Sequence, residues 1–261
     1  MKVFLQNLRP DSSSFLVLQN AEHWFWERGY EIGHFSVPDL SAGLLDPALL
    51  EQREETILFA IPEVMRMALR RLNHAEPPLF ELPDCLMPWI GRFTWETTLG
   101  QVRDQVDSEI GFNPFHIRPL DSKRIFKGTI VYGLRDLIPS ASLANETPVL
   151  AQQKVEFVSE WRAFVFRDKV IHLSRTKGDV LRYPDREVML AAINTFTNRS
   201  IVFGMDWGIT ASGQTLLIDV NDGIAAGNLG MHGQIFAAMI EAKWRNWIGL
   251  ADNGIGDCFT R

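Results

Sequence analysis

The chain has 261 residues, of which 46% are hydrophobic and 22% are charged, as is ordinary for a globular protein. This length allows one large domain or two smaller ones. The net charge of −6 argues against a nucleic-acid partner held through phosphate contacts. Two distant cysteines, Cys85 and Cys258, form neither a metal-ligand pattern nor a disulfide framework. With no signal peptide and no run of about 18 apolar residues, we expect a cytoplasmic protein without a membrane partner.

The first third of the chain predicts a small α/β layer, because strand-like and helix-like patterns alternate there. A cluster of aromatic residues at positions 23–26 is expected to pack in the core or at an interdomain surface, with ligand binding as the alternative. The predicted elements are a strand at 2–6, a helix with a serine cap at 12–14 that ends near 28, strands at 30–37 and 56–61, a short helix within the loop at 39–50, a helix from Pro62 to about 72, and a proline-rich linker at 75–88.

The middle third predicts a helix at 97–110 and then a short strand, Phe115–Arg118. Along this strand Phe115 and Ile117 face inward, whereas His116 and Arg118 face outward. The loop that follows, residues 120–128, carries Lys123, Arg124 and Lys127. It is either a phosphate-binding lid or a solvated basic loop.

The segment 148–155 reads as an edge strand, and 156–166 reads as a strand with strict alternation that returns through 170–174. A two-residue turn at 168–169 would place Glu160 opposite Lys177 and Arg162 opposite Arg175. The first pair is explained by an ordinary exposed ion pair. Two opposed arginines repel each other, which favours an anion bound between them.

A helix capped by Asp185 is expected to run to about residue 197, and a second helix is expected at 234–250. Between them, residues 205–221 predict a β-hairpin with a Ser-Gly turn, followed by a glycine-rich loop at 222–233. A two-residue turn places Asp206 directly opposite Asp219, with Asn221 on the same face. Two facing carboxylates and an amide oxygen suit a magnesium ion. The alternatives are a solvated strand face and a longer loop that breaks this pairing.

This pattern of Asp206 followed by Asp219-x-Asn221 resembles the metal-binding end of the ATP-grasp superfamily. The resemblance extends to Arg118-Pro119, which is similar to the clade with arginine in place of a nucleotide-binding lysine, a clade associated with peptide-modifying ligases. It departs at Asp219, where glutamate is usual, and in the glycine-poor lid. It implies an α/β (α+β) fold with a pre-grasp domain at 1–88 and an ATP-grasp domain at 89–261, with lobes at about 89–148 and 149–261.

The resemblance also implies site residues and cofactors. ATP and Mg²⁺ are the implied cofactors, and small-molecule or peptide carboxylates and amines are the implied substrates. The implied metal ligands are Asp206, Asp219 and Asn221, the implied catalytic residues are Arg162 and Lys127, and the implied nucleotide-binding residues are Arg118, Lys127, Gln152, Gln153, Glu160, Arg162, Arg175 and Lys177, with Arg92 as a further basic contact.

The activity that follows is an ATP- and magnesium-dependent ligase that joins a carboxylate to an amine or thiol through an acylphosphate. Two alternatives remain open. One is a nucleotide-binding protein without turnover, and the other is a phosphotransferase that leaves its product phosphorylated.

Overall fold

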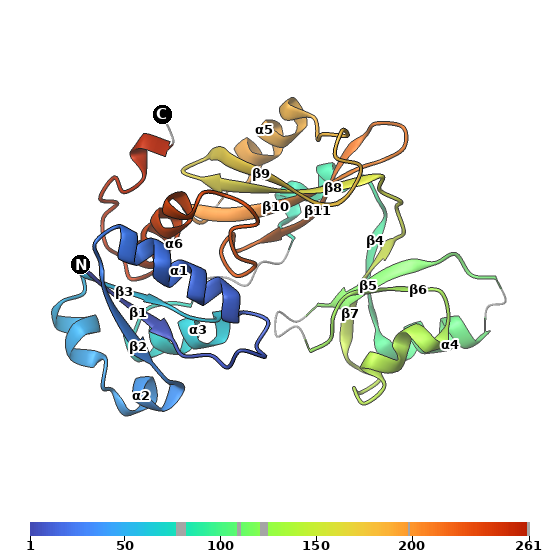
Figure 1. Cartoon of the computed structure of the whole chain (residues 1–261). Coiled ribbons are helices and arrows are strands. Elements are labelled where there is room, and N and C mark those ends of the chain that lie inside the picture. The colour runs from blue at the N-terminus through green and yellow to red at the C-terminus, as the bar shows by residue number, and fades with distance from the viewer. Residues whose placement is uncertain (77–81, 109–110, 121–124, 198, 260–261) are drawn as a thin grey trace.

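The computed structural model describes all residues except 77–81, 109–110, 121–124, 198 and 260–261, and its strands form three sheets (Figure 1). The first sheet is parallel, with strand order β2-β1-β3. It comprises β1 (Lys2–Gln6), β2 (Glu31–Phe35) and β3 (Thr56–Phe59), with helices α1 (Phe15–Glu27), α2 (Val37–Ala42) and α3 (Pro62–Arg71) between and after them. The predicted strand–helix–strand opening is confirmed. The predicted serine cap is wrong, because Ser14 occupies the N-cap position without a side-chain hydrogen bond.

The second sheet is antiparallel, with strand order β4-β7-β5-β6. Its strands are β4 (Thr94–Thr98), β5 (Phe115–Pro119), β6 (Thr129–Val131) and β7 (Pro148–Gln153), and α4 (Leu99–Ser108) follows β4 directly. The prediction that 148–155 is an edge strand is wrong, since β7 pairs with β4 on one side and β5 on the other. Strand β4 is mostly polar and does not alternate between buried and exposed residues, so its sequence did not predict a strand.

The third sheet is also antiparallel, with strand order β11-β10-β8-β9. Its strands are β8 (Ser159–Phe166), β9 (Lys169–Gly178), β10 (Val202–Ile209) and β11 (Thr215–Asn221). Helix α5 (Arg186–Thr195) covers one face, and helix α6 (Gly233–Trp247) packs on part of the other. Asp185 caps α5 through the backbone N–H groups of Glu187 and Val188, as predicted.

Alternation along β8 divides this sheet between two cores. Ala163 and Val165 pack with α5 in one hydrophobic cluster, whereas Phe164 and Phe166 pack in another with α6 and the first sheet. The first sheet and the third therefore share one hydrophobic core. The second sheet has its own core, which it builds with α4.

Helix α6 lies between the first and third sheets and is almost wholly buried. Trp24 of the aromatic cluster packs edge-on against Phe236 of α6 and lies over Gly233, which leaves no room for a Cβ atom. Phe25 is in the core, whereas Trp26 is exposed. The expected packing role is thus confirmed for Trp24 and Phe25.

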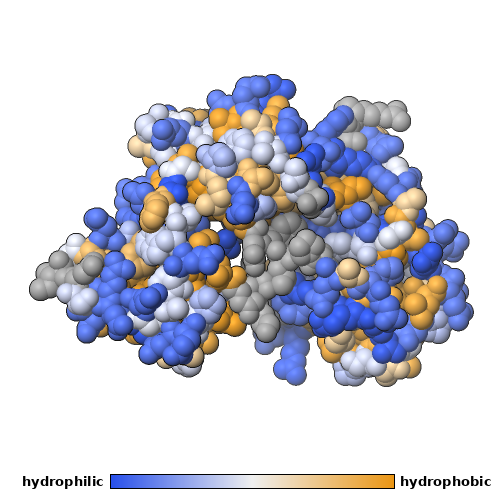
Figure 2. Space-filling view, turned by 180° about the vertical axis from the view of Figure 1, so that it is seen from behind, coloured by the Kyte–Doolittle hydropathy of each residue, from blue (hydrophilic) through white to orange (hydrophobic). Residues whose placement is uncertain are grey.

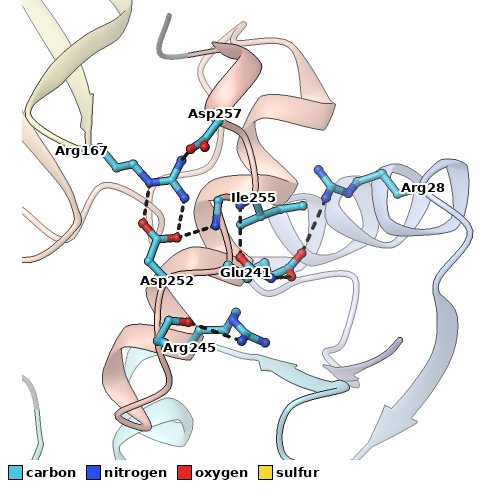
Figure 3. A network of polar contacts seen from close by, with 10 residues as sticks. Arg28, Arg167, Glu241, Arg245, Asp252, Ile255 and Asp257 are labelled. Carbon is cyan, nitrogen blue, oxygen red and sulfur yellow. Dashed lines mark hydrogen bonds and ion pairs between the residues drawn. The ribbon is translucent and has the colours of Figure 1, made fainter.

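A polar network also joins the residues that follow helix α1 to α6 and the C-terminal segment (Figure 3). The buried Glu241 accepts hydrogen bonds from Tyr30 and Asn253 and lies 3.6 Å from Arg28. Burial and the hydrogen bond to Glu241 raise the pKa of Tyr30 to about 12. Beside it, Arg167 forms two hydrogen bonds to Asp252 and a third to Asp257. These contacts fix the first sheet to the third.

One face of the molecule is mixed in hydropathy (Figure 2). The view in Figure 2 shows hydrophilic residues over most of this face, with smaller hydrophobic patches between them. In the described part of the chain, no helix combines the length and the apolar character that a membrane crossing requires.

Candidate active site

One face of the third sheet continues past helix α6 and forms the wall of a large cavity. On β8 this face carries Phe164 and Phe166 under α6, and then Glu160 and Arg162 in the cavity. The cavity measures about 1140 Å³. Its walls come from the second sheet, the third sheet, and helices α3 and α6.

The two aspartates predicted as metal ligands lie opposite each other. Asp206 of β10 pairs with Asp219 of β11, and both line the cavity with Asn221. The predicted two-residue turn is wrong, because Thr210 pairs with Gln214 and leaves a three-residue loop. A β-bulge at residue 218 restores the pairing, since Trp207 is opposite Leu217 and Asp206 is opposite Asp219.

Asn221 is held beside the aspartates by its surroundings. Its Oδ1 accepts a hydrogen bond from the Gly223 backbone N–H at 3.0 Å, and its Nδ2 lies 3.5 Å from Asp206 Oδ2. The opposed residue is Gly204, where a Cβ atom would lie 2.3 Å from Asn221 Oδ1. A side chain at position 204 would therefore displace the amide.

The fully buried Lys243 of α6 supports the same corner from behind. Its Nζ donates to the carbonyls of Val202 and Asp222. Burial lowers the pKa of Lys243 to about 8, against the opposing effect of the Asp222 charge. Lys243 thus links helix α6 to the start of β10 and to Asp222, the residue that follows Asn221.

Arg162 forms a bidentate ion pair with Asp206, with distances of 2.6 and 2.7 Å from Nε and Nη2 to the two carboxylate oxygens. The pair is mostly buried, with 16% and 21% of the two side chains exposed. The hydrogen bond and the charges of Asp206 and Asp219 raise the pKa of Arg162, against burial, which is the largest single influence and acts to lower it. Arg162 therefore faces the predicted metal ligands.

The predicted opposition of Arg162 and Arg175 is wrong. The turn after β8 consists of Arg167 and Asp168, and two β-bulges in β9 shift the register. Arg162 pairs with Ser174, and Arg175 pairs with Trp161, whose side chain faces away from the cavity. Arg175 does not line the cavity and donates instead to the carbonyl of Gly178. No anion site between two arginines exists here.

Glu160 pairs with Lys177, as predicted, with 3.2 Å between Oε1 and Nζ. Both residues line the cavity, but Lys177 is largely exposed. We therefore describe this contact as a surface ion pair at the mouth of the cavity, worth about 0–1 kcal/mol.

The second sheet supplies the opposite wall. The predicted alternation of β5 is confirmed, because Phe115 and Ile117 are buried in its core while His116 and Arg118 line the cavity. Gln152 and Gln153 of β7 line it too, as does Lys127 in the loop before β6. Among the described residues, neither Arg118 nor Lys127 has a hydrogen bond or ion pair with another side chain, whereas Lys123 and Arg124 lie outside the described residues.

His116 is held in its neutral form. Burial, together with the nearby charges of Arg92 and Arg118, lowers the pKa of His116 to about 4. Its Nδ1 is buried and has no hydrogen-bond partner among the residues that the structure describes. A Cβ atom at Gly128 would lie 2.8 Å from His116 Nε2, so the loop after Lys127 passes close over this ring.

Arg92 links the two sheets across the cavity. Its Nη1 donates to the Leu217 carbonyl at 2.8 Å, and its Nη2 donates to the Ile218 carbonyl at 2.9 Å and to Gln152 Oε1 at 3.2 Å. Burial is the main cause that lowers the pKa of Arg92 to about 10. The sequence suggested a phosphate contact here, and the structure shows that its donors hold the bulge of β11.

The cavity also includes residues that the sequence did not indicate. Glu63 and Arg66 of α3 and Trp247 of α6 line it, although they lie outside every motif. Their approach depends on how the first sheet packs against the third, which no local pattern in the sequence encodes.

The matching family model is described as an ATP-grasp domain of R2K clade family 2, and it covers residues 89–239. The fold is similar to that of the Bacillus anthracis D-alanine–D-alanine ligase complexed with ATP, at 15% identity and a TM-score of 0.56, over 95% of this chain and 97% of that one.

Two further solved structures show the same fold. For the D-cycloserine synthetase DcsG the identity is 15% and the TM-score 0.51, over 91% of this chain and 97% of that one. For a RimK domain ATP-grasp protein from Sphaerobacter thermophilus the identity is 16% and the TM-score 0.50, over 92% of this chain and 100% of that one. No curated protein sequence matches at a significant level. Because the family model covers more than half of its length, the chain belongs to the ATP-grasp family, R2K clade family 2.

Proposed function

We propose that this protein is an ATP- and magnesium-dependent ligase that joins a carboxylate to an amine or a thiol. The observation that carries the proposal is the composition of the cavity. Asp206, Asp219 and Asn221 lie on one wall, and Arg118 and Lys127, which pair with no other side chain in the described part of the chain, lie on the other. Hard oxygen ligands that face cationic groups are the arrangement that a magnesium–nucleotide complex requires.

The donor set fits magnesium. Two carboxylates and one amide oxygen from neighbouring strands suffice, because magnesium in nucleotide sites keeps waters and phosphate oxygens as its other ligands. No cluster of three His, Cys, Asp or Glu side chains that could hold a metal occurs among the described residues, so the proposed site has two carboxylates and an amide as its protein ligands. Bound magnesium would neutralise charge on the nucleotide phosphates.

The remaining residues receive roles from their positions. Arg118 and Lys127 would bind the phosphates, with Arg162 next to the metal ligands. Gln152 and Gln153 line the cavity and would lie beside the adenine, although the Gln153 N–H itself already donates to the Phe93 carbonyl. Glu160 would contact the ribose. Arg175 has no role, because it lies outside the cavity.

The proposed chemistry needs no side-chain nucleophile. A carboxylate oxygen of the acid substrate attacks the γ-phosphorus of ATP, and ADP leaves. The amine or thiol then attacks the carbonyl carbon of the resulting acylphosphate, phosphate leaves, and the nucleophile loses a proton. Positioning and electrostatic stabilisation by Arg118, Lys127 and Arg162 would supply the rate enhancement.

The test measures phosphate release from ATP with magnesium over a panel of paired acids and amines, with products identified by mass spectrometry. We expect release that depends on both substrates and a product joined by an amide or thioester bond. Absence of magnesium-dependent nucleotide binding would contradict the proposal.

A second candidate, a nucleotide-binding protein without turnover, is favoured by one specific observation. The Arg162 guanidinium already occupies both carboxylate oxygens of Asp206, which metal binding would have to share or release. Nucleotide binding without phosphate release from any acid–amine pair would support this candidate.

A further inference from the structure

The end of the cavity that is formed by helices α3 and α6 is not needed by the nucleotide contacts proposed above. The whole cavity, at about 1140 Å³, is larger than a typical single-ligand site of roughly 300–1,000 Å³. Gln152, Gln153 and Arg118 belong to the second sheet, whereas this end is lined by the residues of the first and third parts of the chain, Pro62, Glu63, Met65, Arg66, Ala225 and Trp247. The structure therefore leaves space for another ligand beyond the phosphates.

Arg66 is the cation that α3 presents to this space. Its only charged contact among the described residues is Glu63, one turn earlier on the same helix, at 3.6 Å. That distance is too long for a hydrogen bond, and Glu63 is 71% exposed. The guanidinium of Arg66 thus makes no hydrogen bond with the described protein, although its side chain is only 22% exposed.

Two other arginines of helix α3 have hydrogen-bond partners in the described part of the chain, unlike Arg66. Arg71 makes two hydrogen bonds of 2.7 Å to Asp46 and a third to the Ser41 carbonyl. Arg70 also has a short contact, at 2.6 Å to Glu76. Of these three arginines, only Arg66 lines the cavity. Its five donors suit bidentate binding of a carboxylate.

Besides Glu63, the α3 and α6 end of the cavity presents apolar side chains. Met65 and Trp247 supply apolar surface, and Ala225 adds a small side chain after the predicted metal ligands. These residues line the same cavity as Asn221 and the other predicted metal ligands.

We propose that Arg66 binds a second carboxylate of the acid substrate, so that the substrate class is a dicarboxylate or a comparable acid with an anionic group besides the reacting one. This inference rests on the proposed function, because it takes the reacting carboxylate to lie beside Arg162 and the metal ligands. Arg66 then acts as a specificity residue and takes no part in phosphoryl transfer.

The experiment measures binding directly and so does not depend on turnover. The full chain is loaded with a non-hydrolysable ATP analogue and magnesium, and is titrated calorimetrically with succinate, glutarate and adipate, each beside its monoamide. The monoamide has nearly the same size and lacks one charge. The variants are Arg66→Met and Arg66→Lys, with Arg70→Gln as a matched control on the same helix, and thermal melting establishes that each is folded.

In the wild type and in Arg70→Gln, we expect at least one diacid to bind about ten-fold or more tightly than its monoamide. Arg66→Met is expected to abolish this preference without changing the affinity for the nucleotide analogue, and Arg66→Lys is expected to keep part of it. The inference is overturned if no diacid is preferred, or if Arg66→Met keeps the preference. Phosphate release is measured separately, so its absence would count against the ligase activity and leave the binding result intact.

Discussion

Asp206 and Asp219 carry the facing carboxylates of the proposed metal site, so a single substitution at either position tests metal binding. They lie on the same sheet face, and Arg162 forms two hydrogen bonds to Asp206. A divalent cation between the two carboxylates would relieve their mutual repulsion. Substitution of Asp219 tests the metal site without breaking the ion pair between Arg162 and Asp206.

We predict that Asp219→Asn lowers the affinity for magnesium in the presence of nucleotide by about ten-fold or more, because an amide supplies one weak oxygen ligand in place of a charged carboxylate. Calorimetric titration with magnesium measures this. Asp107→Asn, which changes an exposed aspartate on α4, is the control. Equal affinities in both variants would place the metal elsewhere.

His116 gives a pH-dependent contribution to stability. Its pKa is about 4 in the folded state against an ordinary value of 6.5, so the unfolded chain binds more protons between these values. Stability therefore rises with pH from about 4 to 6.5 and is lost on acidification through the same range, by roughly 3 kcal/mol.

Chemical denaturation of wild type and His116→Gln at several pH values measures this effect. We expect the variant to show a shallower dependence of the free energy of unfolding on pH below 6.5. Identical slopes in the two proteins would mean that His116 is not held neutral by its surroundings.

At the scale of elements, the contact between α1 and the start of α6 leaves no space for a side chain at Gly233. A Cβ atom there would lie 2.0 Å from Trp24 Nε1, and that indole also packs against Phe236. We predict that Gly233→Ala lowers the free energy of unfolding by about 1–3 kcal/mol. Gly133→Ala is the matched control, because its backbone is extended and no atom lies within 4 Å of the added methyl group.

Denaturant titration of the two variants distinguishes a local from a general effect. A stable Gly233→Ala protein would mean that α1 shifts away from α6 without cost. That outcome would also weaken the view that the first and third sheets form one rigid body.

The sequence predicted elements well where burial alternates and poorly where register depends on bulges. Strand β8, with Ala163 and Val165 on one face and Arg162 on the other, follows directly from its alternation. The opposition of Arg162 and Arg175 failed because bulges in β9 insert residues that no periodicity reveals. The pairing of Asp206 with Asp219 was predicted from a wrong turn, and the bulge at residue 218 compensates for it.

The candidate site could be predicted only in part for a related reason. Arg162, Asp206 and Asp219 came together because neighbouring strands of the third sheet carry them. Arg66 and Trp247 could not be foreseen, since they reach the cavity through packing between sheets that are distant in sequence. The role of Arg92 also escaped, because its partners are backbone carbonyls.

At the scale of the whole molecule, the cavity joins parts that otherwise have separate cores. The second sheet has its own core, which includes residues of α4 and also Leu137, whereas the first and third sheets share one core. A ligand in the cavity would contact the second sheet, the third sheet and helix α3. We predict that magnesium and ATP together, at about 100 times the dissociation constant, stabilise the protein by about 2.7 kcal/mol. For a chain of this length the melting temperature would rise by roughly 2–4 °C for each kcal/mol.

Calorimetric melting with and without the nucleotide measures this shift, and Asp219→Asn is expected to reduce it. A shift of the same size without magnesium would indicate that the nucleotide binds without the predicted metal ligands.

The chain enters and leaves the second sheet through neighbouring strands. Strands β4 and β7 are hydrogen-bonded neighbours, and the Gln153 N–H donates to the Phe93 carbonyl at 2.8 Å. The chain therefore departs from the rest of the molecule and returns to it at almost one point, as an inserted module does. Replacing residues 94–152 by a short linker should leave the core shared by the first and third sheets folded. The shortened protein should not bind the nucleotide.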